Sequence, residues 1–174
     1  MFWKVEYFIR EFAKEHGPFN VVLDIGSLDV NGGVRDVIVK EQFCTGHFVG
    51  IDMREGPGVD LVCDGHDIHK RFGPEPQFDL ITCCETLEHD IRFWETVNNM
   101  RSLVKPGGWM LVTAPGINFF KHNHPYDYYR FTEESFTHYM FKDFENVYVE
   151  LYEDLADDNR KPNNSVLGYG RRPL

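Results

Sequence analysis

The stretch Val21-Val22-Leu23-Asp24-Ile25-Gly26-Ser27 decides the fold of this chain. It is an apolar run interrupted by one acidic residue and followed directly by a glycine. A short, nearly continuous apolar run is typical of a strand in a parallel sheet that is covered on both faces. Gly26 allows the backbone to turn sharply and a ligand to approach it closely. The stretch therefore predicts an α/β fold with a pocket at the end of this strand.

Two further apolar runs also end in an acid, Phe48-Val49-Gly50-Ile51-Asp52 and Leu61-Val62-Cys63-Asp64. In an open parallel sheet the ligand lies beyond the carboxyl ends of the strands, so Asp24, Asp52 and Asp64 are expected to face one ligand. A dinucleotide carries a pyrophosphate, which prefers bare amides and a helix N-terminus. S-adenosylmethionine carries a sulfonium and an amino group and no phosphate. The acids therefore favour S-adenosylmethionine over NAD.

The remaining elements alternate between helical and extended patterns. Apolar residues at helical spacing over 3–14 predict an N-terminal helix that packs on the sheet or covers the pocket. Leu87 to Met100 carries apolar residues every three or four positions, which predicts one long crossover helix. Further strands are expected over 78–84, 109–113, 147–151 and 166–170, and a helix is expected after the capping residue Thr132.

Several blocks in a fixed order resemble the class I S-adenosylmethionine-dependent methyltransferases, in particular the small type 11 domains. They are Leu23-Asp24-Ile25-Gly26-Ser27, Gly50-Ile51-Asp52, Cys63-Asp64-Gly65, the run from Phe78 to His89, and Leu103-Val104-Lys105-Pro106-Gly107-Gly108. The resemblance implies a Rossmann-like three-layer sandwich whose seven-stranded sheet is mostly parallel with one late antiparallel strand. It extends over most of the chain, so residues 1–174 are expected to form a single domain, with 1–16 as the N-terminal helix.

The resemblance also implies the residues that bind the cofactor. Gly26 and Ser27 are expected at the methionine moiety, Asp52 at the ribose hydroxyls, and Met53 on the adenine. Asp64 and the backbone of Gly65 are expected at the adenine edge, with His66 or Asp67 as alternatives. The expected cofactor-binding set is Asp24, Gly26, Ser27, Asp52, Met53, Asp64, Gly65 and Glu85. The family's second turn glycine is replaced here by Leu28, so nothing is carried over to the loop that follows.

The candidate catalytic residues are His89, His124 and Asp127. His89 follows the fourth strand and has the side chain best suited to act as a general base near neutral pH. The run from His122 to Thr132 is rich in aromatic and hydrogen-bonding groups, which predicts the wall of the acceptor site. The alternative for this run is a rigid loop held by an ion pair between Asp127 and Arg130. For Glu85 and Glu88 the alternative is stabilisation of a helix N-terminus.

No metal site is predicted. His66 and His69 have the spacing of a ligand pair on a helix, but no third ligand accompanies them. The four cysteines also lack the spacing of a metal site, and three of them lie in predicted strands. We expect them to be reduced and to pack as small apolar groups.

The composition limits the remaining possibilities. The 174 residues are 42% hydrophobic, enough for one domain with a substantial core. The net charge of -10 argues against unaided binding to nucleic acid, because phosphate contacts need clustered Lys and Arg. No window approaches the roughly 20 apolar residues of a membrane span, and the N-terminus lacks a signal-peptide layout. The expectation is a soluble, cytoplasmic protein of open oligomeric state.

The predicted function is methyl transfer from S-adenosylmethionine to a small-molecule acceptor, through oxygen, nitrogen or carbon. An alternative is a non-catalytic S-adenosylmethionine-binding subunit that acts with a partner, since the chain is short for a separate substrate domain. An NAD-dependent dehydrogenase would need a Gly-x-Gly-x-x-Gly turn, which the chain lacks. The sequence leaves open the acceptor, the methylated atom and the use of a general base.

Overall fold

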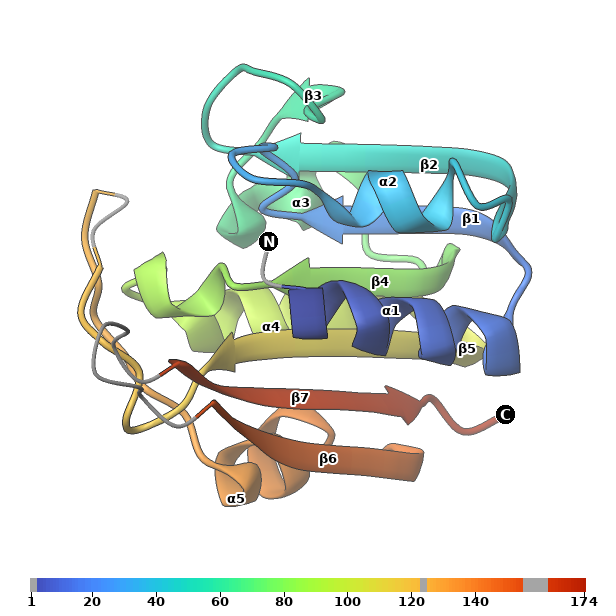
Figure 1. Ribbon diagram of the computed structural model, residues 1–174. Coiled ribbons are helices and arrows are strands. Elements are labelled where there is room, and N and C mark those ends of the chain that lie inside the picture. Colours follow the sequence, from blue (N-terminus) through green and yellow to red (C-terminus); the bar gives the residue numbers. More distant parts are fainter. Residues whose placement is uncertain (1–2, 123–124, 155–162) are drawn as a thin grey trace.

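A computed structural model of the chain describes residues 3–122, 125–154 and 163–174. One seven-stranded sheet forms its centre, in the order β3-β2-β1-β4-β5-β7-β6 (Figure 1). The strands are β1 (Phe19–Ile25), β2 (Cys44–Asp52), β3 (Leu61–Val62), β4 (Phe78–Cys84), β5 (Val104–Pro115), β6 (Glu145–Asp154) and β7 (Asn163–Arg171). The helices are α1 (Trp3–His16), α2 (Val34–Ile38), α3 (Ile68–Phe72), α4 (Phe93–Leu103) and α5 (Glu133–Ser135), with shorter helical turns η1 (Gly65–Asp67), η2 (Leu87–His89) and η3 (Phe136–Met140).

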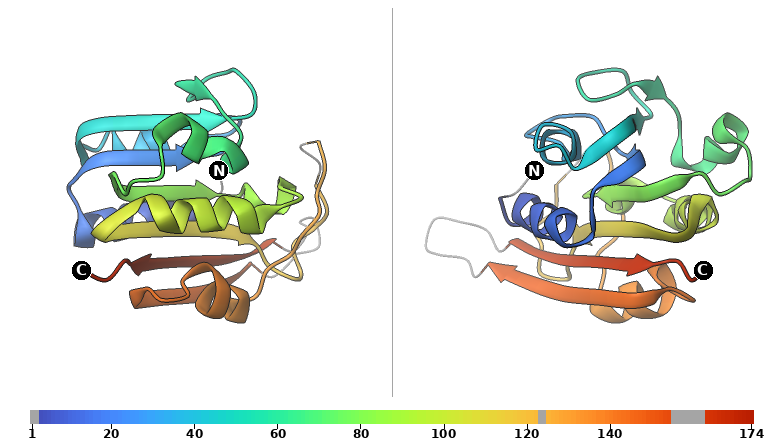
Figure 2. Two further views of the ribbon diagram at one scale, coloured as in Figure 1. Left: turned by 180° about the vertical axis from the view of Figure 1, so that it is seen from behind. Right: turned by 90° about the vertical axis from the view of Figure 1, so that its right-hand side faces the viewer.

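Alternating side chains of the strands build two hydrophobic layers. Val22, Leu80, Leu111 and Leu167 point to the face covered by α1 and α2. Their chain neighbours, among them Leu23, Ile81, Val112 and Val166, point to the opposite face, where α4 and the α5–η3 segment pack. Successive side chains of a strand point to opposite faces, so both faces of these central strands are apolar. Figures 1 and 2 show the helices on either side of the sheet, which makes the predicted three-layer sandwich.

The strand directions also agree with the prediction. β1 pairs in parallel with β2 and β4, and β4 pairs in parallel with β5. β7 is inserted between β5 and β6 and is antiparallel to both, so it is the single late antiparallel strand. After β3 the chain crosses back to β1, and β4 pairs with β1 on the side opposite to β2. Ligands of open α/β sheets bind at such a reversal, beyond the carboxyl ends of the strands.

The prediction of one helix from Leu87 to Met100 is wrong. η2 ends at His89, and α4 begins only at Phe93. Asp90 interrupts the helix because its Oδ1 accepts a hydrogen bond from the Arg92 backbone N–H at 2.8 Å. The apolar spacing continues through the break, so periodicity alone could not detect it.

Helix α1 packs on the sheet. Val5, Phe8, Ile9 and Phe12 are buried in the layer that covers this face. None of the described residues of α1 lines the pocket described below. No helix within the described parts of the chain is long and apolar enough to cross a membrane.

Candidate functional site

A pocket of about 690 Å³ lies at the carboxyl ends of β1, β2 and β4. This volume is in the usual range for a small-molecule or cofactor site. The acidic residues Asp24, Asp52, Asp64, Glu85 and Asp90 line it, together with the arginines Arg54 and Arg92. The excess of carboxylates suits a ligand that carries positive charge, as the sequence predicts.

All eight residues of the expected cofactor-binding set line this pocket: Asp24, Gly26, Ser27, Asp52, Met53, Asp64, Gly65 and Glu85. The N–H groups of Gly26 and Ser27 both donate to the Ile51 carbonyl at 2.9 Å, which fixes the turn after β1 against β2. Gly26 has a φ of 79°, and a Cβ atom there would lie 2.0 Å from Thr86 Oγ1. This turn therefore requires glycine for conformation and for space. The Ser27 hydroxyl donates to the Gly58 carbonyl at 3.0 Å, so it holds the neighbouring loop.

Asp24 lies at the base of the pocket with only 2% of its surface exposed. Its Oδ1 accepts a hydrogen bond from the Thr82 hydroxyl at 2.7 Å. Burial raises the pKa of Asp24 to about 6, although the Thr82 hydroxyl favours the ionised form. A cationic ligand group next to this carboxylate would favour its ionised form.

Asp52 is the last residue of β2, and its side chain is 13% exposed. Its Oδ1 accepts a hydrogen bond from the Arg54 N–H at 2.9 Å, which orients the carboxylate at the pocket edge. Met53 beside it is 69% exposed and presents an apolar surface to the pocket. The carboxylate can accept hydrogen bonds from two hydroxyls, and the exposed apolar side chain beside it can pack on the face of a ring.

The next segment of the lining is held by a polar network around Asp90. The Asp64 carboxylate accepts from the His66 N–H at 2.9 Å and thereby caps η1. His66 Nε2 lies 2.7 Å from Asp90 Oδ1, and the Thr96 hydroxyl donates to Asp90 Oδ2 at 2.6 Å. A Cβ on Gly65 would lie 2.6 Å from Thr96 Oγ1, so this glycine lets η1 approach α4 closely. No local sequence pattern indicates the role of Asp90, because the apolar helical spacing continues on both sides of it.

Glu85 follows β4 directly and has a φ of 49°, a conformation that non-glycine residues rarely adopt. Both of its carboxylate oxygens are buried, and neither has a hydrogen bond to any described group. Burial, and secondarily the charge of Glu88, raise the pKa of Glu85 to about 8. An unpaired carboxyl group at this point of the pocket can receive a cation or a hydrogen-bond donor.

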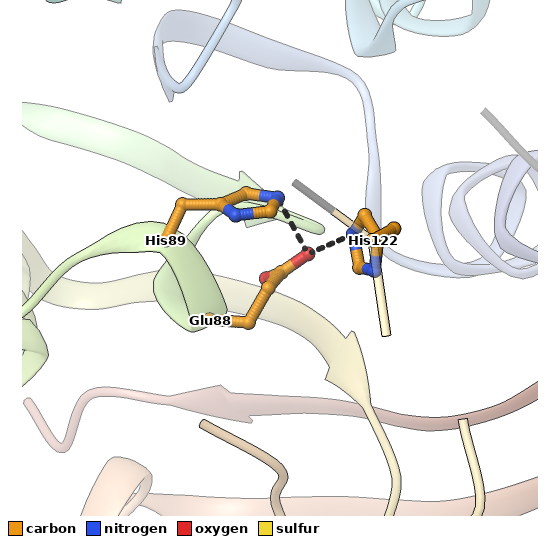
Figure 3. Close-up of side chains that lie close together, drawn as sticks. All are labelled: Glu88, His89 and His122. Carbon is orange, nitrogen blue, oxygen red and sulfur yellow. Dashed lines mark ion pairs between the residues drawn. The ribbon is translucent and has the colours of Figure 1, made fainter. Parts of the chain in front are cut away.

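The side chains of Glu88, His89 and His122 converge, as Figure 3 shows. His89 Nε2 and His122 Nε2 each lie 3.4 Å from Glu88 Oε1. The Glu88 side chain is fully buried, whereas the two imidazoles are 17% and 23% exposed and line the pocket. The Glu88 carboxylate raises the pKa of His122 above its usual value. His122 comes from the loop after β5, so sequence spacing could not show this convergence.

An ion pair between Asp127 and Arg130 holds the loop after β5. This is the rigid loop predicted as the alternative for the run from His122 to Thr132. Both Asp127 oxygens accept from the Arg130 guanidinium, at 2.5 and 2.7 Å. Arg130 also donates to the carbonyls of Phe119, Phe120 and Tyr129. The ion pair lowers the pKa of Asp127 to about 2. The Asp127 side chain is 1% exposed and does not line the pocket, which favours a positioning role over the predicted catalytic one.

The remaining predictions concern His124, the pair His66 and His69, and the cysteines. His124 lies outside the described residues. His66 and His69, considered as a metal pair, point to different partners, Asp90 and Ser102. The four cysteines are free, and burial raises the pKa of Cys63, Cys83 and Cys84, so these thiols are protonated.

Comparison with known proteins identifies the family. A family model described as a methyltransferase domain matches residues 4–151. No curated protein matches the chain. Among solved structures, the N-methyltransferase NodS from Bradyrhizobium japonicum WM9 is similar, with 15% identity, coverage of 99% of this chain and 96% of that chain, and a TM-score of 0.71.

Two further structures share the fold. One is an S-adenosylmethionine-dependent methyltransferase from Archaeoglobus fulgidus, with 15% identity, coverage of 98% of this chain and 94% of that chain, and a TM-score of 0.71. The other is the 1,6-didemethyltoxoflavin-N1-methyltransferase from Burkholderia thailandensis with its acceptor and S-adenosylhomocysteine bound, with 15% identity, coverage of 99% and 81%, and a TM-score of 0.66. The match over 4–151 covers most of the chain, and the chain therefore belongs to the methyltransferase domain family as an S-adenosylmethionine-dependent enzyme.

Proposed function

We propose that the chain transfers the methyl group of S-adenosylmethionine to a small-molecule acceptor bound between Glu85 and the loop after β5. The observation that carries this proposal is an acidic pocket that joins the strand-end carboxylates to an aromatic and imidazole-lined wall. The Burkholderia thailandensis enzyme, which has a similar fold, was crystallised with bound 1,6-didemethyltoxoflavin. The chemical type of the acceptor atom stays open.

The cofactor would occupy the β1–β2 half of the pocket. Asp52 would accept hydrogen bonds from the ribose hydroxyls, and Met53 would pack on the adenine. Asp64 and the Gly65 backbone would lie at the adenine edge. The buried carboxylate of Asp24 would lie near the cationic amino group, which favours its ionised form.

The acceptor would occupy the other half. His89, His122, Tyr126 and Tyr128 line the pocket together with Glu85. Tyr126 and Tyr128 are 62% and 42% exposed, with ring centroids 5.7 Å apart. Partly exposed aromatic rings at a pocket mouth can stack on a flat acceptor and limit the access of water.

The reaction needs alignment more than covalent participation by the protein. The acceptor electron pair attacks the methyl carbon, the bond between carbon and sulfur breaks, and its electron pair stays on the sulfur of S-adenosylhomocysteine. An oxygen or nitrogen acceptor also loses a proton, which a base that lines the pocket can accept. Holding the two reactants in line supplies roughly 7–11 kcal/mol of the barrier reduction.

The alternative is that the chain binds S-adenosylmethionine without turnover and positions a partner protein. The buried Glu85 carboxyl group, which has no hydrogen bond from the described residues, and the two imidazoles in the same pocket favour the enzyme, since a pure binding subunit has no need of them. Turnover of an acceptor by the isolated chain would exclude the alternative.

The first experiment is calorimetric titration of the purified chain with S-adenosylmethionine and S-adenosylhomocysteine. Asp52→Ala should weaken both by about 10- to 100-fold, because it removes charge-assisted hydrogen bonds to two hydroxyls. Asp36→Ala is the matched control, because Asp36 on α2 pairs with Lys40 and does not line the pocket. Equal affinity for the wild type and Asp52→Ala would contradict the assignment.

The second step is a panel of amine and hydroxyl acceptors, assayed by release of S-adenosylhomocysteine. Phe and Ala substitutions at Tyr126 should raise the KM for the acceptor and leave cofactor binding unchanged. Cofactor binding without turnover of any acceptor, reversed by addition of a partner, would favour the non-catalytic alternative.

A further inference from the structure

The cluster of Glu88, His89 and His122 has the geometry of a set of metal ligands (Figure 3). Each imidazole Nε2 lies 3.4 Å from the same carboxylate oxygen, and the three donor atoms lie within 4.8 Å of one another. A distance of 3.4 Å is longer than a normal hydrogen bond. It matches the separation of about 3.4 Å between two ligands that each lie about 2.1 Å from one tetrahedral Zn²⁺.

Both imidazoles direct Nε2 at Glu88 and have an oxygen atom on the Nδ1 side of the ring. His89 Nδ1 lies 2.5 Å from the Tyr126 carbonyl oxygen, which can only accept, so Nδ1 carries the proton. In the neutral ring Nε2 then presents its lone pair to the Glu88 carboxylate. His122 Nδ1 lies 3.6 Å from Asp127 Oδ2. A carbonyl or carboxylate behind the distal nitrogen is the usual support of a metal-binding histidine.

The carboxylate itself lacks another partner. Glu88 has no exposed surface, and no described group forms a hydrogen bond with either of its oxygens. The two oxygens of neighbouring Glu85 are equally buried and without a hydrogen bond from the described residues. Buried carboxylates that are not satisfied in this way are costly, and a cation between Glu88 and the imidazoles would satisfy them.

We propose that Glu88, His89 and His122 bind a divalent transition metal ion at the acceptor end of the pocket, with Glu85 next to it. Two imidazoles and one carboxylate suit borderline ions such as Zn²⁺, Fe²⁺, Co²⁺ or Mn²⁺, and three protein ligands leave a position open to another molecule. An acceptor oxygen at that position would be polarised by the ion. The metal site itself does not depend on the identity of the acceptor.

The test is metal binding by the full chain after treatment with a chelator and its removal. Titration with Zn²⁺ by calorimetry should give one equivalent per chain. Titration with Co²⁺ should give visible absorption without a thiolate charge-transfer band, which excludes the cysteines as ligands. Glu88→Gln and His122→Asn should each lower the affinity at least about 100-fold, because loss of an outer partner alone typically costs 10- to 100-fold.

His69→Asn is the matched control, since His69 Nε2 bonds to Ser102 and lies outside the pocket lining. It should bind metal like the wild type. Titration of every variant with S-adenosylhomocysteine shows separately that the fold and the cofactor site are intact. The absence of stoichiometric binding by a wild type that still binds S-adenosylhomocysteine would overturn the proposal. Metal binding that is unchanged in Glu88→Gln and His122→Asn would also overturn the proposal. Glu88 would then only form ion pairs with the protonated imidazoles of His89 and His122.

Discussion

Asp24→Asn should stabilise the protein and weaken its cofactor binding. Asp24 is 2% exposed, and burial raises its pKa from 3.8 to about 6. A raised carboxyl pKa means that the folded state binds the proton more tightly than the unfolded state. The contribution of Asp24 to stability is therefore most favourable below pH 3.8 and falls as the pH rises to about 6, above which the loss is constant. Asn removes the charge and keeps the shape, and its amide can donate to Thr82 Oγ1.

The size of the effect follows from the two pKa values. Their difference means that ionisation of Asp24 lowers the free energy of unfolding by about 3 kcal/mol at pH 7.5 and by about 1 kcal/mol at pH 4.5. Asp24→Asn should be more stable than the wild type by these amounts. The assay is urea unfolding of the wild type and Asp24→Asn at both pH values, followed by tryptophan fluorescence. Asp36→Asn, on the exposed side of α2, is the matched control and should show no such pH dependence.

The same variant should bind S-adenosylmethionine more weakly, because it no longer offers a carboxylate to the amino group. A variant that is less stable than the wild type at pH 7.5 would refute the argument about burial. A stability difference that does not shrink toward pH 4.5 would show that it does not come from ionisation of Asp24.

Three further substitutions test the fold around the pocket. Gly26→Ala should lower the free energy of unfolding by about 2–4 kcal/mol in urea titrations, because it combines a positive φ with a collision at Thr86; a change below about 0.5 kcal/mol would contradict this. Arg130→Met should reduce kcat/KM for the acceptor but not the calorimetric affinity for S-adenosylhomocysteine, since it releases the buried Asp127; equal loss of both would show a general structural defect. Thr132→Ala should cost about 1 kcal/mol in the same unfolding assay through loss of the capping box, and Thr132→Ser should restore it.

The strands were predictable because their signals are local. β4 spans Phe78–Cys84 as predicted, since a continuous apolar run there ends at a charged residue. The ends of β1 and β2 at Ile25 and Asp52 followed from the same pattern. The strand-end acids then placed the pocket, because parallel strands present their carboxyl ends on one edge.

The features that could not be predicted depend on contacts between residues that are distant in the sequence. The break before α4 is made by the Asp90 carboxylate, whose partners lie in η1 and α4. The contact of Glu88 with His122 joins residues separated by α4, β5 and the first part of the loop that follows β5. A histidine in a polar loop has no periodicity that would indicate which carboxylate it meets.

The loop after β5 has a consequence for how this enzyme can change its acceptor. Its two ends meet at a bridge between Gly116 and Phe131, and the Arg130 guanidinium bonds to carbonyls of the loop itself. The loop is also tied to η2, because the Tyr128 N–H donates to the Glu88 carbonyl at 2.8 Å and the Tyr126 carbonyl oxygen lies 2.5 Å from His89 Nδ1. If this loop forms the proposed acceptor wall, a graft between Gly116 and Phe131 that keeps these two contacts should change the acceptor and leave the cofactor-binding residues on β1 and β2 in place.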